Sequence, residues 1–70
     1  MMPLTIGKCG ENYTITKVGG GPETKKHLED LGFHVGGNIS IVSVINGNLI
    51  VAVKDSRIAL DSELAKKIMI

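Results

Sequence analysis

Hydrophobic and β-branched residues are concentrated in the middle of the chain, in the segment NISIVSVINGNLIVAVK at 38–54. Two apolar runs flank Asn46-Gly47-Asn48, and a short Asn-Gly link between β-branched runs is typical of a β-hairpin. A two-residue turn would place Val44 opposite Leu49, whereas a three-residue loop would place Ile45 opposite Leu49. The sequence leaves this register open. In either case the hairpin has two apolar faces, one with Ile39, Ile41 and Ile45 and the other with Val42 and Val44.

Before the hairpin, the pattern changes from helical to glycine-rich within a few residues. We expect a helix from Pro22 to Leu31, because proline suits the first helical position and Leu28 lies on the same face as Leu31. Gly32 then stands at the position where a Schellman motif needs a left-handed residue, and Leu28 and Phe33 stand at the two positions whose side chains touch. The sequence therefore predicts a sharp reversal from helix to sheet at Gly32.

The remaining apolar positions predict short elements. The alternation over Tyr13–Val18 favours a strand, and Asp61 is a good N-cap for a helical turn over Ser62–Lys66. The expected class is therefore all-β with one short helix, folded as a small, partly open barrel, since closure protects sheet edges. Further short strands are expected at Leu4–Ile6, Arg57–Leu60 and Ile68–Ile70, the last of which would close the sheet.

Composition narrows the class of protein. A chain of 70 residues suits one domain, expected over 1–70, with a small core. The net charge of +1 gives no reason to expect a nucleic-acid partner, and one cysteine excludes an internal disulfide. No apolar run approaches the roughly 20 residues that span a bilayer, and the first residues lack the pattern of a secretion signal. We expect a cytoplasmic protein that does not insert into a membrane.

Candidate chemistry is sparse. His27 and His34 are separated by the expected helix end at Gly32, so helical spacing does not bring them together, and Cys9 precedes a glycine in an expected turn. These three side chains are weak candidates for binding Fe²⁺ or Zn²⁺, and no cofactor is expected. No serine has a histidine and carboxylate at a recognisable spacing, so the sequence indicates no enzyme. Two aromatic residues are too few for a proline-rich peptide groove or a nucleic-acid stacking platform.

Two segments, LGFHVGGNISIV at 31–42 and RIALDSELAKKIMI at 57–70, separated by the hairpin, resemble the FeoA family. Members are small cytosolic companions of the bacterial ferrous iron transporter FeoB, and the same domain is fused to some iron-dependent repressors. The resemblance runs from Leu4 to Ile70 and implies an SH3-like barrel. It implies a non-catalytic regulatory domain that docks on the cytosolic GTPase portion of an FeoB-like transporter. The alternative is a sensor module that binds a transition metal directly.

The two-faced hairpin predicts where a partner would bind. If the face with Ile39 and Ile41 forms the core, the other face stays outside, and a helix with only two leucines can shield only part of it. An exposed apolar patch on a small protein typically marks a contact surface, and it would also permit weak self-association. The residues expected to bind the partner, on the outer hairpin face and the adjoining helix, are Lys25, Leu28, Val42, Val44 and Ile50.

Overall fold

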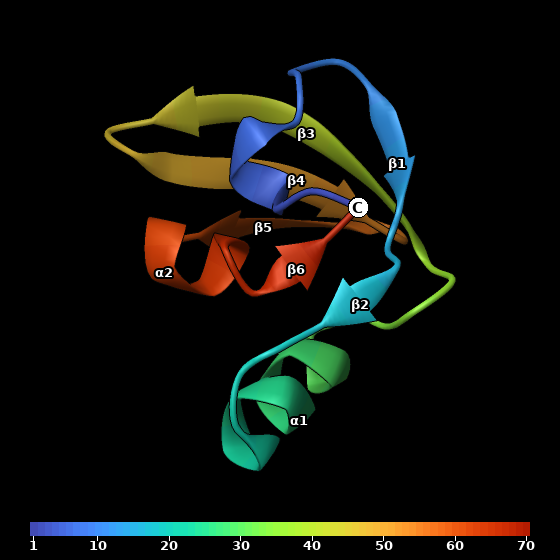
Figure 1. The fold of residues 1–70 in the computed structure, drawn as a ribbon. Helices are drawn as coiled ribbons and strands as arrows, with labels where there is room; N and C mark the ends of the chain where they lie inside the picture. The colour runs from blue at the N-terminus through green and yellow to red at the C-terminus, as the bar shows by residue number, and fades with distance from the viewer.

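The computed structural model describes residues 1–70 and consists mainly of short β-strands (Figure 1). One nine-residue α-helix and two helical turns complete the fold. This confirms the predicted class, all-β with one short helix. In chain order the elements are η1 (Leu4–Ile6), β1 (Asn12–Thr14), β2 (Lys17–Val18), α1 (Pro22–Asp30), β3 (Asn38–Ile45), β4 (Asn48–Val53), β5 (Ser56–Leu60), α2 (Ser62–Ala65) and β6 (Ile68–Met69).

Two antiparallel sheets form the framework. The larger has the strand order β1-β3-β4-β5, and the smaller pairs β2 with β6. Figure 1 shows η1 and α2 against the curved large sheet, with α1 beyond β2. The two sheets do not join into a closed cylinder, so the barrel is partly open, as the sequence predicted.

The strand expected over Tyr13–Val18 is divided between the two sheets. The chain changes hydrogen-bond partners at its centre, because Ile15 N–H donates to Gly37 O at 2.9 Å and Thr16 N–H donates to Met69 O at 2.8 Å. The residues before this point pair with β3 and those after it pair with β6. One alternating stretch of sequence therefore connects both sheets.

The two ends of the chain also differ from the prediction in detail. Leu4–Ile6 is a 3-10 turn rather than a strand, and Leu4 is buried. At the other end, β6 pairs with β2 instead of closing the large sheet. The predicted N-cap is confirmed, since the Asp61 carboxylate accepts a hydrogen bond from Leu64 N–H at 2.9 Å.

The β3–β4 hairpin turns through Asn46 and Gly47 alone. Both residues have positive φ, 51° and 81°, as a type I′ turn requires. Val44 lies opposite Leu49, so the two-residue turn is the correct alternative at this end of the hairpin. The Asn-Gly pair thus determines how the two strands meet.

A β-bulge at Val42 then changes the relation between the two faces of β3. The register shifts between Ile41 and Ser43, and one extra residue moves every later side chain to the opposite face. Because directly opposite residues share a face, Val44 lies on the same face as Leu49, whose side chain is buried. Figure 1 shows the hairpin turn projecting past η1, and Val44 stays exposed there although Leu49 is covered.

The bulge corrects two sequence predictions. Val44 does not share the outer face with Ile50, and Ile45 does not share the core face with Ile41, because the bulge exchanges the faces between them. The predicted core face at the base of the hairpin is confirmed. Its buried residues are Ile39, Ile41, Val51 and Val53.

The helix stop has the predicted geometry. α1 ends at Asp30, and Gly32 has φ of +109°. Phe33 N–H donates to Leu28 O at 2.9 Å, and Gly32 N–H donates to Glu29 O at 3.0 Å. These are the two hydrogen bonds of the Schellman motif.

A single apolar cluster fills the interior. Phe33 is its largest side chain, and no polar or charged side chain is buried. The cluster draws on nearly every element, which explains how so small a chain forms one core. Its members are Leu4, Ile15, Val18, Leu28, Phe33, Ile39, Ile41, Leu49, Val51, Val53, Leu60, Ala65 and Ile68.

Candidate docking surface

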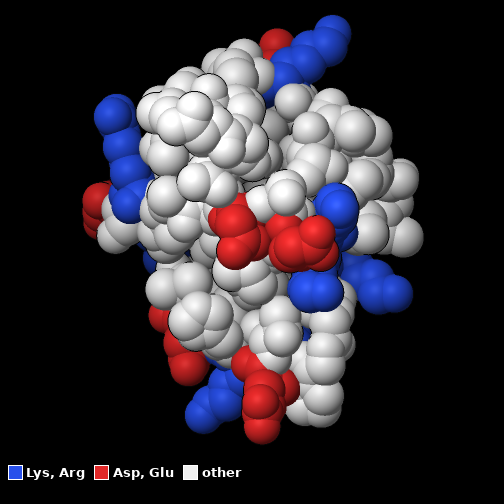
Figure 2. Space-filling view, turned by 90° about the vertical axis from the view of Figure 1, so that its left-hand side faces the viewer, with Lys and Arg blue, Asp and Glu red and all other residues white.

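Three exposed apolar side chains gather at the turn end of β3. Val42 is 38% exposed, and Val44 and Ile45 are each 55% exposed. We call these three residues the hairpin-tip surface. Figure 2 views the molecule from the side of this turn, and a broad area of its upper half lacks Lys, Arg, Asp and Glu. Val44 and Ile45 lie on opposite faces of β3, so the apolar surface wraps around the tip, and an exposed apolar area on a small protein typically marks a contact site.

The charge pattern separates this surface from the rest of the molecule. The hairpin segment 38–53 contains no charged residue, although charged residues make up 21% of the chain. The turn that joins β3 to β4 projects from the molecule and carries no charge. Such a surface favours contact with another apolar surface over contact with a charged ligand.

The structure does not support α1 as part of the same surface. Leu28 is fully buried, so its side chain offers no surface to a partner in this structure. Lys25 is exposed, but the end of α1 lies at the base of the hairpin, where a Cβ on Gly32 would be 3.7 Å from the Val53 side chain. Val44 lies opposite Leu49, four residue steps of β4 from Val53, so about 14 Å separates this helix end from the tip.

The other predicted contact residues keep some exposed area. Ile50 is half-buried on the outer face, opposite Ser43 on one side and Ala59 on the other. The sequence places Ile45 on the core face and so does not predict its exposure. Its outward position follows from the bulge, and no pattern in the apolar run indicates a bulge.

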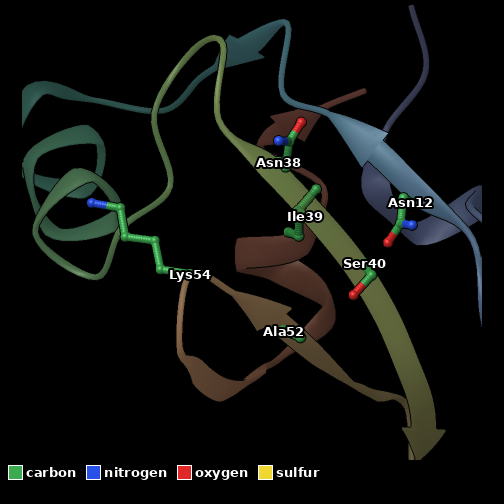
Figure 3. Close-up of a pocket in the computed structure, with 6 residues that line it drawn as sticks. All are labelled: Asn12, Asn38, Ile39, Ser40, Ala52 and Lys54. Carbon is green, nitrogen blue, oxygen red and sulfur yellow. The ribbon is translucent and has the colours of Figure 1, made fainter.

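A second feature lies on the outer face of the large sheet (Figure 3). Asn12, Ser40 and Ala52 form a row across β1, β3 and β4, and an open hollow of ≈260 Å³ lies over them. Asn38 and Lys54 also border it, and Figure 3 shows the Lys54 side chain extending away from the other labelled residues. The hollow offers amide and hydroxyl groups, but no carboxylate, thiol or imidazole.

The weak metal candidates belong to separate segments. Cys9 is exposed just before β1, His27 lies in the last turn of α1, and His34 is exposed in the loop before β3. No group of three or more His, Cys, Asp and Glu side chains is placed to hold a metal ion. The structure does not bring the three predicted candidates into one group.

The sheets, the short helix and the open barrel define a small SH3-like domain. The family model for the FeoA domain matches residues 2–70, and the chain belongs to the FeoA family. A curated relative, "Putative Fe(2+) transport protein A" of Methanocaldococcus jannaschii, is 33% identical over 70 residues, which cover the whole chain and 85% of the relative. None of the helices is long and apolar enough to cross a membrane.

Solved structures share the fold. The FeoA of Stenotrophomonas maltophilia, complexed with zinc and described as a prokaryotic SH3 domain protein, matches with a TM-score of 0.85 and 23% identity. The match covers 99% of this chain and 88% of that one. A manganese-dependent transcriptional repressor matches with a TM-score of 0.85 and 17% identity over 94% of this chain and 38% of the repressor. The predicted SH3-like fold is thereby confirmed.

Proposed function

We propose that this protein is a non-catalytic accessory domain of ferrous iron uptake, which docks through the hairpin-tip surface on the cytosolic part of an FeoB-like transporter. Membership of the FeoA family and the relative named for Fe(2+) transport support the link to iron uptake. The family resemblance supports the choice of partner.

One observation carries the choice of surface. Val44 and Ile45 are each more than half exposed, yet they belong to β3, one of the two central strands of the large sheet, and are held in place by pairing with β4. A rigid apolar projection loses little conformational entropy on binding. This distinguishes the tip from apolar residues in loops, which must also be ordered.

The size of this surface suits reversible docking. Apolar burial contributes about 25 cal/mol per Å², and association costs several kcal/mol before any net affinity remains. Three partly exposed side chains therefore support modest affinity only. Modest affinity suits a partner that this protein must bind and release repeatedly.

The test is a binding titration against the purified cytosolic portion of an FeoB-like transporter. Val44→Lys should weaken binding by about tenfold or more, because a buried unpaired ammonium is costly. Val35→Lys is the matched control, since Val35 is a valine of similar exposure, 63%, in the loop before β3. It should bind as the unchanged protein does. Equal affinity of Val44→Lys and the unchanged protein, or equal losses in both variants, would contradict the assigned surface.

A further inference from the structure

One edge of the large sheet is only partly covered. β1 pairs with the first residues of β3, Asn38–Ser40, and Gly10 N–H then donates to Ile41 O at 2.7 Å. Beyond that point residues 42–45 have β4 on one side only. None of the backbone hydrogen bonds made by turns, loops and caps involves residues 42–45. Figure 1 shows no segment beside this part of β3.

Apart from the bulge at Val42, this edge lacks the features that usually protect one. Natural edge strands carry lysine, proline or a covering loop, whereas residues 42–45, Val-Ser-Val-Ile, include neither charge nor proline. The opposite edge of the sheet, β5, carries the exposed cation Arg57 at its second position. The bulge at Val42 confines the free region to the tip but leaves Ser43–Ile45 regularly paired with β4.

We infer that a second copy of this chain pairs with this edge, β3 against β3 in antiparallel orientation about a two-fold axis. About such an axis β3 pairs with an identical strand, so the residues that meet across the axis must suit one another. Pairing centred on Val44 places Val44 opposite Val44 of the other copy and Ser43 opposite Ile45, so that residues of one face meet residues of the same face. No like charges meet in this pairing, whereas a β5 pair centred on Arg57 would place one Arg57 opposite another.

The dimer is weak and depends on concentration. Four residues from each copy bury on the order of a few hundred Å², well below the roughly 1,000 Å² of a stable interface. The contact covers Val44, which also belongs to the hairpin-tip surface. The pairing does not depend on the proposed function, but if both hold, self-pairing and transporter docking exclude each other.

Cross-linking tests the pairing without any transporter. In a Cys9→Ser background, Val44→Cys would place two thiols on directly opposite residues, whose Cα atoms lie about 4.5–5.5 Å apart, within the range of a disulfide. The control is Val35→Cys in the same background, since Val35 is at least as exposed. Mild oxidation at high protein concentration should produce a disulfide dimer from the Val44→Cys variant several times faster than from the Val35→Cys variant.

Sedimentation of the unmodified protein provides the second measurement. Its average mass should rise with concentration toward twice 7.4 kDa, and Val44→Lys should remain monomeric over the same range. Equal cross-linking rates at the two sites would overturn the inference. A monomeric mass at every concentration, or dimerisation unaffected by Val44→Lys, would also overturn it.

Discussion

Phe33 N–H donates a hydrogen bond to the carbonyl oxygen of Leu28 at 2.9 Å, and both side chains are fully buried. The bond fixes the end of α1, and the two side chains connect the helix to the core beneath the sheet. Gly32 makes this possible, because its φ of +109° lies where side chains with a Cβ are strained.

Gly32 should therefore be sensitive to substitution for backbone reasons. A Cβ there would meet only Val53, at an ordinary contact distance of 3.7 Å. Gly32→Ala should reduce the free energy of unfolding by about 1–2 kcal/mol, and Gly32→Val by more, since valine is β-branched. Gly32→Asn should cost less than Gly32→Ala, because asparagine tolerates left-handed conformations. Denaturant midpoints measure all three, and equal losses for Asn and Ala would argue against backbone strain as the cause.

The N-cap of α2 gives a prediction about a single hydrogen bond. Asp61→Ala removes the acceptor of the 2.9 Å bond from Leu64 N–H and should reduce stability by about 1 kcal/mol. Asp61→Asn is the control, because its amide oxygen can accept the same bond. Thermal unfolding should place the Asn variant close to the unchanged protein, and similar losses in both variants would assign the effect to charge instead.

The hairpin tip should tolerate a charge without loss of fold. Val44→Lys should change the free energy of unfolding by no more than about 0.5 kcal/mol, as is usual for exposed sites, because the Val44 side chain is 55% exposed. Val51→Lys is the contrasting variant, since Val51 is fully buried and an unpaired charge there should prevent folding. Circular dichroism and urea titration distinguish the two. Unfolding of Val44→Lys would show that the tip belongs to the core.

Metal titration separates the accessory domain from a metal sensor. We predict that His27→Ala and His34→Ala leave any weak Zn²⁺ or Fe²⁺ affinity nearly unchanged, because the two residues belong to no group of three or more potential ligands. Isothermal calorimetry at neutral pH measures this. Submicromolar binding that either substitution abolishes would favour the sensor function.

Local patterns in the sequence determined much of this fold. The Asn46-Gly47 turn, the helix stop at Gly32 and the cap at Asp61 were predictable because each depends on the backbone preferences of a few adjacent residues. The base of the hairpin was predictable too, since alternating β-branched residues identify a buried face.

Only the tertiary structure decided how these pieces combine. The change of partners at Ile15 depends on strands far away in the chain, and alternation alone cannot reveal it. No pattern in the uniform apolar run reveals the bulge at Val42. The bulge nevertheless places Val44 on the core face and Ile45 on the outer face, the reverse of the prediction. The two apolar faces of the hairpin predicted a docking surface there, but which residues are exposed depends on where the register shifts and on how far η1 covers the sheet.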